Sequence, residues 1–503
     1  MTLILAIDQG TTNSKALLVN DEGRVLARAS RPTGIEYPRP GWVQQDADSI
    51  WQSVRGAVED CLAQMPSETP VAIGISNQRE SVVVWDRLTG RPLAPCISWQ
   101  CTRSTAICEA VKARGLAGAI EQKTGLVVEP MFSASKATWL LDNIDGLRRR
   151  AESGDVCIGT VDSWLVWNLT GGGAHVTDAS NASRTLLLNI GREAWDDELL
   201  EMFAIPSQAL AKIVPSNGFF GNTENVAGLP SGIPITGVAG DSHAAMFGHC
   251  SYSEGSVKAT YGTGSSLMML SGAQQPRELS RTIAWRIGAE REYALEGNIA
   301  STGATLDWFG RFMNDGEARE GPLPIEESHS NGVYLVPAFS GLAAPHWNTE
   351  ARALLTGMTF GTTAKHVARA AMESIAFQVA DVLDVMERAG GKPISELMVD
   401  GGASQSDTLM QFQADIIGRP VVRNHCTDLS AFGAALLAGL GSGVWSDTVA
   451  IQALPRETDR FLPRMAEDER NSLLGGWHDA INRATIGSLN PMEAPACTGT
   501  NSE

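Results

Sequence analysis

Two glycine–threonine segments, far apart in the chain, carry the residues best suited to bind phosphate. The first is GTTN at residues 10–13 and the second is YGTG at residues 261–264, each between strand-like runs. Glycine lets the backbone N–H groups of a tight turn converge, and threonine hydroxyls add donors, so both turns suit polyphosphate oxygens. Between them Asp241 follows an apolar run. Together these features indicate a phosphotransferase with two lobes.

Two aspartates stand where a carboxylate could act on a hydroxyl or a phosphate. Asp241 precedes the helix-like SHAAMFG and could accept the proton of a substrate hydroxyl as phosphoryl transfer begins. Asp8 precedes the first turn and could hold Mg²⁺. Plainer roles are a helix cap for Asp241, which local sequence favours, and turn formation for Asp8. Only the two phosphate turns favour the catalytic role of Asp241.

Charged and aromatic side chains in other loops suit a polyhydroxylated substrate. Arg79, Glu80 and Trp99 follow strand-like runs; charged groups bind adjacent hydroxyls, and an indole covers a C–H face. A surface ion pair and a core tryptophan are the alternatives. Lys15 could offset γ-phosphate charge or be solvated. The DGGAS turn at 400–404 could admit a flat ligand such as adenine or be an ordinary connection.

Composition and charge exclude several classes of function. The 503 residues, 43% of them hydrophobic and 19% charged, suit two large globular domains. The net charge of −18 disfavours nucleic acid and anionic membrane as partners, since both need basic surface. The chain lacks GxxxxGK[ST], HExxH and GxSxG, which argues against a P-loop protein, a zinc protease and an α/β-hydrolase.

The periodicity predicts an α/β protein. Residues 3–30 read as three antiparallel strands with turns at 9–12 and 21–23. Apolar residues four apart predict a helix after Asp46, and a second, longer helix is expected over 367–386, ending at Gly390 and Gly391. A strand at 396–400 and a further helix ending at Gly418 follow. Strand, glycine turn and helix in that order build ligand sites at strand ends.

The division of the chain and its cellular setting can also be predicted. The two turns form a weak internal repeat, so a domain boundary is expected near 246–255, giving domains 1–250 and 251–484 and a loose tail at 485–503. The eight cysteines lack metal-ligand spacing and read as reduced packing residues. Without signal-peptide features or a membrane-spanning run, we expect a cytoplasmic protein.

The ordered motifs resemble the FGGY carbohydrate kinases of the actin/hexokinase/Hsp70-like ATPase superfamily, and within them the glycerol kinase branch. The resemblance runs from about residue 3 to 446. The segments that carry it include IDQGTTNSKA, GISNQRESVVVWDRLTG, SWQCTR, FSASKATWLLDN, HVTDASNASRT, GVAGDSHAAMFG, TYGTG, YALEG, VDGGASQSD and AFGAALLAGL. It implies two RNase-H-like α/β domains with an active-site cleft between them, an ATP and Mg²⁺ requirement, and a homodimer or homotetramer.

Carried over position by position, the resemblance implies a complete site. Asp241 would be the general base and, with Asp8, would hold Mg²⁺. The substrate-binding residues would be Arg79, Glu80, Trp99, Met131, Asp241, Ser242 and Ser266. The nucleotide-binding residues would be Thr11, Thr12, Asn13, Lys15, Thr263, Gly264, Gly303, Gly402 and Ser406.

Departures from the glycerol kinase pattern bear on the substrate. Met131 replaces a tyrosine, Ser242 a glutamine and Ser266 a phenylalanine, which implies a roomier pocket. Ser406 replaces an asparagine on the adenine side. Phosphorylation of a terminal hydroxyl of glycerol is therefore the default expectation. A four- or five-carbon polyol or ketose such as erythritol, threitol, xylitol or xylulose is the alternative, and an actin- or Hsp70-like ATPase module is the non-kinase alternative.

Overall fold

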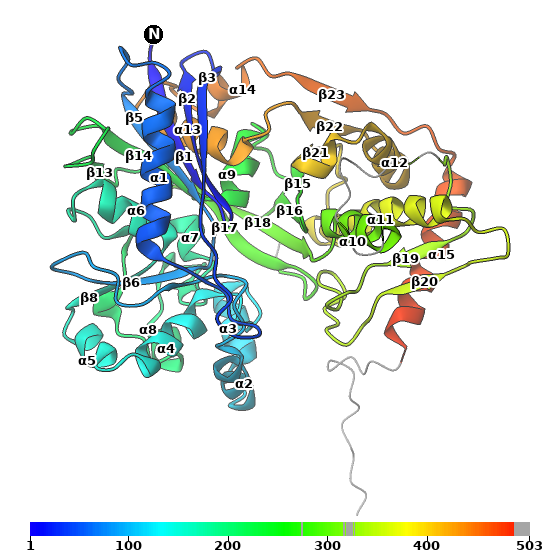
Figure 1. The fold of residues 1–503 in the computed structure, drawn as a ribbon, viewed down its shortest axis with the longest axis horizontal. Helices are drawn as coiled ribbons and strands as arrows, with labels where there is room; N and C mark the ends of the chain where they lie inside the picture. The colour runs from blue at the N-terminus through cyan, green and yellow to red at the C-terminus, as the bar shows by residue number, and fades with distance from the viewer. Residues whose placement is uncertain (273–274, 315–316, 318–324, 326, 487–503) are drawn as a thin grey trace, which may run out of the picture.

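The protein has two lobes, each built on a mixed β-sheet, as the computed structural model shows (Figure 1). It describes residues 1–486 except 273–274, 315–316, 318–324 and 326. The first sheet has the order β13-β14-β5-β1-β2-β3 and the second β17-β18-β16-β15-β21-β22-β23. A smaller sheet with the order β4 (Gln44–Gln45), β7 (Cys96–Ile97), β6 (Val82–Asp86) and β8 (Val156–Thr160) lies in the first lobe. The α/β prediction is confirmed.

The first sheet brings three loop-forming strand ends to one edge. Its strands are β1 (Leu3–Gln9), β2 (Asn13–Asn20), β3 (Val25–Pro32), β5 (Ala72–Asn77), β13 (Gly221–Asn222) and β14 (Pro234–Gly240). β1, β5 and β14 are parallel, and Asp8 pairs in register with Ser76, which pairs with Ala239. Because the carboxyl ends of parallel strands meet at one edge, Asp8 near the end of β1, Asn77 at the end of β5 and Asp241 directly after β14 lie at that edge.

The second sheet repeats the hairpin and its parallel neighbour. Its strands are β15 (Val257–Tyr261), β16 (Ser265–Leu270), β17 (Ser280–Ile287), β18 (Glu290–Ile299), β21 (Leu397–Asp400), β22 (Val421–Asn424) and β23 (Thr458–Phe461). β15 is antiparallel to β16, as β1 is to β2, and parallel to β21, as β1 is to β5. The predicted internal repeat and the three N-terminal strands are confirmed.

The predicted helices are also present. α1 (Ala47–Leu62) begins after Asp46, whose side chain accepts hydrogen bonds from the N–H groups of Asp48 and Ser49. α11 (Ala364–Gly390) ends at Gly391, which takes the left-handed conformation that glycine adopts at little cost. α12 (Asp407–Ile417) ends in the same way at Gly418. Local apolar periodicity and glycine therefore set these helices.

Helix α13 (Leu429–Gly441) leaves the second sheet and packs on the first. It lies against α9 (Asp241–Gly248), β5 and β14. A methyl group on Gly433 would lie 1.8 Å from the carbonyl oxygen of Ala244, and one on Gly74 would lie 2.1 Å from that of Ala434. Only glycine permits this approach. The domains expected at 1–250 and 251–484 stay a prediction, and α13 belongs by packing to the first lobe.

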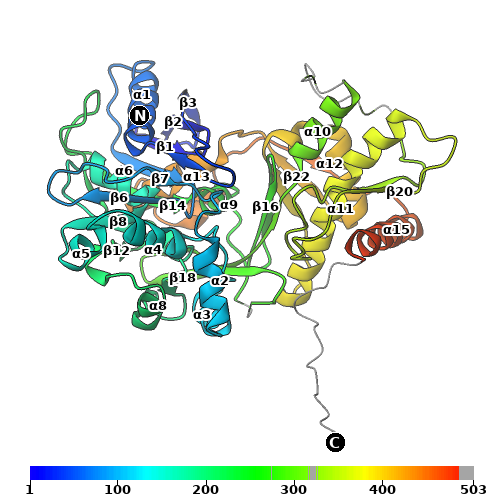
Figure 2. The same cartoon turned by 60° about the horizontal axis from the view of Figure 1, so that its bottom comes forward.

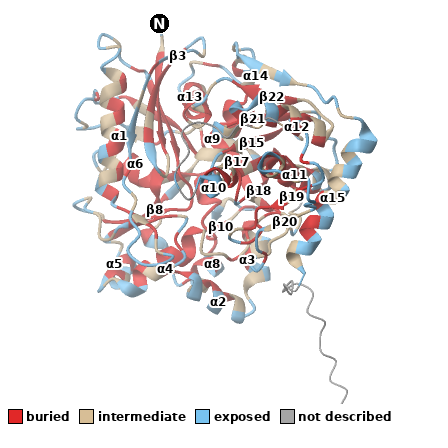
Figure 3. Ribbon diagram, turned by 45° about the vertical axis from the view of Figure 1, so that its right-hand side comes forward, coloured by how far each residue is buried: buried red, intermediate tan, exposed pale blue. Residues whose placement is uncertain are grey.

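The core follows the strands of both lobes. Figure 3 shows buried residues along the two main sheets, and Figures 1 and 2 both place α9 between the lobes, where it contacts β15 and β16. Seven cysteines are free, six of them buried, in agreement with the packing role; Cys497 and residues 487–503 of the expected tail lie outside the described residues. No helix of the described residues is long and apolar enough to cross a membrane.

Candidate active site

Asp8 and Asp241 lie close enough to influence each other at the edge of the first sheet. Asp8 Oδ1 accepts a hydrogen bond of 2.8 Å from the Ser76 hydroxyl. Burial raises the pKa of Asp8 to about 6; Lys15 opposes this shift, and the negative charges of Asp241 and Asp428 add to it. Removal of the Asp8 carboxyl from water and the crowding of negative charge mark this edge as a place where a cation would be stabilised.

Asp241 is the first residue of α9, not its cap. The N-cap position is held by Gly240, so the helix-cap role favoured by local sequence is wrong. The Oδ1 atom of Asp241 instead accepts from Arg79 Nε at 3.0 Å and from its neighbour's backbone N–H at 2.7 Å. Within the described chain no donor reaches Oδ2, and the side chain is 38% exposed. The carboxylate is therefore held by one oxygen and open at the other.

Arg79 and Glu80 are buried and belong to a chain of alternating charges. Arg79 Nη2 lies 2.8 Å from Glu296 Oε1, and Arg184 Nη1 lies 2.5 Å from Glu296 Oε2. Arg184 Nε donates to Glu80 Oε1 at 2.6 Å. The order is thus Asp241, Arg79, Glu296, Arg184, Glu80. The surface ion pair offered as an alternative is wrong, because Arg79 and Glu80 are buried and pair with other residues.

Electrostatic interactions among these residues favour the charged forms of Glu296 and Arg79. Burial alone would raise the pKa of Glu296, but Arg184 and Arg79 hold it well below its usual range. Burial would likewise lower the pKa of Arg79, but Glu296, Glu80 and Asp241 raise it. Arg79 Nη1 is buried and has no hydrogen-bond partner in the described structure. A buried donor of this kind fits an acceptor oxygen on a ligand.

Two serines close this cluster from the two lobes. Ser242 Oγ accepts from Arg79 Nη2 at 3.3 Å and donates to Ser266 Oγ at 3.1 Å. Ser266 Oγ in turn donates to Glu296 Oε1 at 3.3 Å. Both serines are half-buried. The structure therefore brings four of the predicted substrate residues, Arg79, Asp241, Ser242 and Ser266, into one hydrogen-bonded group.

Trp99 links the substrate residues to the first phosphate turn. Its indole N–H donates to Thr11 Oγ1 at 3.0 Å, and the ring is half-buried, so the core-tryptophan alternative is wrong. Met131, also half-buried, precedes α4 (Ser133–Asn143). The buried amino group of Lys136 donates to the carbonyl oxygens of Met131 and Phe132. The Met131 backbone is thus anchored while its side chain stays accessible.

The second phosphate turn is held by glycine contacts. A methyl group on Gly264 would lie 2.4 Å from the carbonyl oxygen of Ile299, and one on Gly303 would lie 2.7 Å from that of Gly262. The N–H of Gly303 donates to the same Gly262 oxygen at 3.0 Å. Thr263 at the tip is exposed. Gly264 and Gly303 therefore have a packing reason to be glycine, and they leave the tip accessible.

The DGGAS turn lies beside the second phosphate turn. A methyl group on Gly401 would lie 2.4 Å from the carbonyl oxygen of Tyr261, whereas one on Gly402 would meet no atom within 4 Å. Ser406 caps α12 by accepting from the Leu409 N–H at 3.3 Å. Gly402 faces open space, which suits the approach of a flat ligand. The side chain of Ser406 acts as a helix cap.

The first phosphate turn presents exposed polar groups and a paired lysine. Thr12 and Asn13 are exposed at the tip. Lys15 Nζ forms an ion pair of 2.9 Å with Asp428 Oδ1, at the start of α13, so its side chain is neither free in solvent nor unpartnered. No hydrogen bond within the described chain joins this turn directly to the second one. Asp241 and its charged neighbours lie between the two lobes instead.

The residues present fit a magnesium ion held partly by phosphate. The described residues contain no group of three or more His, Cys, Asp and Glu side chains arranged to hold a metal. Mg²⁺ in phosphoryl-transfer sites usually binds one or two carboxylates together with phosphates and water. Asp8 and Asp241 supply that number of carboxylates, so the donor set fits Mg²⁺ and does not fit a closed structural metal site.

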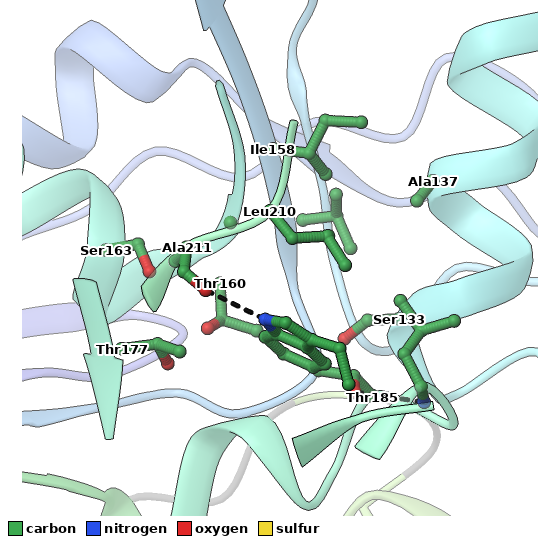
Figure 4. Close-up of a pocket in the computed structure, with 13 residues that line it drawn as sticks. Ser133, Ala137, Ile158, Thr160, Ser163, Thr177, Thr185, Leu210 and Ala211 are labelled. Carbon is green, nitrogen blue, oxygen red and sulfur yellow. Dashed lines mark hydrogen bonds between the residues drawn. The ribbon is translucent and has the colours of Figure 1, made fainter. Parts of the chain in front are cut away.

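A small cavity lies behind the substrate residues, in the first lobe. Its lining mixes hydroxyl and apolar side chains, among them Thr160, Ser163, Thr177, Thr185, Ile158 and Leu210 (Figure 4). The volume of about 30 Å³ has room for about two water molecules. Ser133 lies on its wall and donates to the Glu80 carbonyl oxygen at 3.1 Å. The cavity is too small for a polyol and is a neighbour of the site, not the site itself.

Arg184 and Glu296 are the residues that the sequence-based site lacks. Each lies in a segment that carried the family resemblance, SNASRT and YALEG, but neither was assigned a role. Glu296 is fully buried in β18, whose sequence EREYALEGNI carries charged residues along much of its length and gave no local signal for this burial. Buried charges of this kind require partners.

Comparisons with known proteins identify the relatives of this chain. Residues 3–248 match the N-terminal domain of the FGGY family of carbohydrate kinases, and residues 257–442 match its C-terminal domain. Glycerol kinase of Acinetobacter baylyi is 46% identical over 96% of this chain and 99% of its own length. Glycerol kinase 2 of Thermotoga maritima is 44% identical over 96% and 99%.

Solved structures extend the comparison to the fold. The crystal structure of Plasmodium falciparum glycerol kinase with ADP matches with a TM-score of 0.91 and 32% identity, covering 97% of this chain and 99% of that one. A ligand-bound xylulose kinase from Lactobacillus acidophilus matches with a TM-score of 0.85 at 22% identity, over 97% and 99%, which shows a shared fold. The chain belongs to the FGGY family of carbohydrate kinases and is an ATP-dependent kinase.

Proposed function

We propose that this kinase transfers the γ-phosphoryl group of ATP to a terminal hydroxyl of a small polyol, with glycerol as the default substrate. One observation carries the proposal. The half-open carboxylate of Asp241 lies 3.0 Å from the guanidinium of Arg79, which keeps a buried, unused N–H donor beside it. An acceptor for a hydroxyl proton and a donor to a hydroxyl oxygen thus stand next to each other between the lobes.

The roles follow from chemistry at these atoms. Asp241 Oδ2 would accept the proton of the attacking hydroxyl, and Arg79 Nη1 would donate to a substrate oxygen. Trp99 would cover the C–H face while its N–H orients the first phosphate turn through Thr11. Closure of the lobes around both substrates would exclude water that could otherwise accept the phosphoryl group.

The nucleotide would bind between the two turns. Backbone N–H groups and hydroxyls of Thr11, Thr12 and Thr263 would contact the phosphates, and Gly402 would leave room for the adenosine. Asp8 and Asp241 would hold Mg²⁺, which when bound neutralises charge on the transferred phosphoryl group. Lys15, already paired with Asp428, would contribute its charge at a distance from the γ-phosphate.

The names of the relatives support glycerol, and the pocket supports a second candidate. Met131, Ser242 and Ser266 would line the site with one flexible thioether and two small hydroxyls. The Ser242–Ser266 contact of 3.1 Å offers an extra hydrogen-bonding pair, which favours a four- or five-carbon polyol or ketose. The family match over both segments favours a carbohydrate kinase over an actin- or Hsp70-like ATPase module.

A panel of acceptors tests the proposal. ADP release is measured with glycerol, erythritol, threitol, xylitol, xylulose and ribulose, and without acceptor. We expect acceptor-dependent ADP release with the highest kcat/KM on glycerol. A higher kcat/KM on a longer substrate would replace glycerol by the second candidate, and release indifferent to every acceptor would reject the kinase. The cytoplasmic location and the homodimer or homotetramer stay predictions.

A further inference from the structure

We infer that Glu296, supplied by the second sheet, is the positioning residue that sets the substrate clamp of the first lobe. The clamp here means Arg79, Glu80 and Asp241. The inference rests on the proposed function, because it assigns the support of that same site. It concerns the series of ion pairs described above, which runs through Asp241, Arg79, Glu296, Arg184 and Glu80.

Glu296 is the middle member of that order and the only one of its five residues outside the first lobe. It lies on β18 (Glu290–Ile299), while the other four come from residues 79–241. Its two oxygens serve different arginines, with 2.8 Å from Oε1 to Arg79 and 2.5 Å from Oε2 to Arg184. The side chain has no exposed surface. One carboxylate is therefore ion-paired with two guanidinium groups that no other described acid bridges. The contact with Arg184 is an ion pair and not a hydrogen bond, because Glu296 Oε2 and Arg184 Nη1 have no hydrogen-bond partner in the described structure.

The two arginines transmit this position to the two ends of the clamp. Arg79 donates to Asp241 Oδ1, and Arg184 donates to Glu80 Oε1. Glu80 also has a left-handed backbone, with φ of 63°, which a non-glycine residue holds only when its surroundings determine it. A guanidinium has a planar fork, so moving its carboxylate partner reorients the groups at its other face.

The same glutamate reaches the lobe interface through a second path. Ser266 on β16 donates to Glu296 Oε1, and Ser242 on α9 donates to Ser266. The first path ends at Asp241, and the second ends at Ser242, the next residue in the chain. The clamp therefore keeps this geometry only while β18 packs against the first lobe. The half of the chain that would bind the nucleotide thus contributes to the polyol site.

The test compares two buried glutamates. Glu296→Gln keeps the shape of the side chain but removes the charge that holds both arginines. The matched control is Glu373→Gln in α11, where Glu373 pairs with Arg369 at 2.7 Å in an equally buried position away from the site. Both variants are expected to lower the melting temperature, so stability alone does not separate them.

Kinetics separate them. We expect Glu296→Gln to lower kcat/KM for the polyol about 100-fold, because displacing a substrate-orienting group by about 1 Å has an effect of that size. The KM for ATP is expected to stay within about twofold, since the nucleotide contacts are untouched. Glu373→Gln is expected to change neither kcat/KM for the polyol nor the KM for ATP. Glu296→Asp, which is too short to reach both arginines, is expected to fall between wild type and Glu296→Gln.

Arg184→Lys keeps the test decisive if Glu296→Gln does not fold. Lysine carries the charge without the fork, so it cannot join Glu296 to Glu80, and the same loss confined to polyol kinetics is expected. Polyol kinetics like those of the control, in whichever variant folds, would overturn the inference. Wild-type enzyme inactive on every polyol would instead reject the proposed function, so the two failures are distinguishable.

Discussion

The proposed substrate side and the proposed nucleotide side of the site are made of different kinds of group. Around Asp241 the chain places buried, fully charged side chains that pair with one another, including Arg79 and Glu296. Around the second phosphate turn it places glycines and exposed backbone, with open space at Gly402. The substrate side is therefore set in advance by ion pairs, whereas the nucleotide side relies on N–H groups and room for the ligand.

The largest expected effect is on the carboxylate between these sides. Asp241→Asn keeps the acceptor for Arg79 but cannot take a proton, so kcat should fall about 10²- to 10⁴-fold, the usual range for a general base. Nucleotide affinity, measured by titration of the enzyme with ADP, should change little. Asp407→Asn, an exposed aspartate on the nucleotide side, serves as the control. Activity retained by Asp241→Asn would remove the residue from the base role.

Breaking a buried ion pair on the substrate side should lower the free energy of unfolding more than breaking a half-exposed pair on the nucleotide side. Glu80→Gln leaves Arg184 short of a buried partner, and removing one member of a buried pair costs about 3 kcal/mol or more. Lys15→Met breaks a half-exposed pair on the nucleotide side, worth about 1 kcal/mol or less. Urea unfolding measures both. Equal losses would show that the substrate side is not stabilised in the way described.

Two glycines sharpen the comparison within the nucleotide side. Gly264→Ala would bring a methyl group to 2.4 Å from the Ile299 carbonyl oxygen, so the second turn must shift and the KM for ATP should rise about tenfold or more. Gly402→Ala meets no protein atom within 4 Å and should leave the melting temperature unchanged. Any rise in its KM for ATP would come from contact with the ligand. A Gly264→Ala variant with unaltered ATP kinetics would contradict the account of this turn.

A further prediction concerns the pH dependence of stability and a buried lysine behind the clamp. Burial lowers the pKa of Lys136 to about 7 from its ordinary 10.5. Because the folded state then binds the proton more weakly than the unfolded chain, the free energy of unfolding should rise between pH 7 and pH 10, by up to about 4 kcal/mol. Lys136→Met should lack this rise, and Lys212→Met, which alters an exposed lysine, should keep it. The same slope in all three proteins would contradict the assignment.

The sequence predicted best those helices and turns that nearby residues determine. Apolar spacing predicted α1 and α11, Asp46 was predicted correctly as the cap of α1, and glycine predicted the ends of α11 and α12 and the two hairpin turns. Asp241 shows the limit. Its local sequence favours a cap, and its actual partner, Arg79, is 162 positions away in the chain. No local pattern reports a contact of that range.

The buried charges show the same limit more strongly. Glu296 and Arg184 are 112 positions apart in the chain, and the fold brings them together as a buried ion pair. Lys15 likewise pairs with Asp428, which is 413 positions away in the chain. The residue types of the site could thus be predicted from motifs, but the pairing that holds them in place depends on topology, because strand order decides which distant residues become neighbours.

A crystal structure with a non-hydrolysable ATP analogue, Mg²⁺ and glycerol would test the central claim most directly. The account predicts the γ-phosphate between residues 11–13 and 262–264, and a terminal hydroxyl of glycerol within hydrogen-bond distance of Asp241 Oδ2 and Arg79 Nη1. A nucleotide bound away from either turn, or a polyol remote from Asp241, would contradict it.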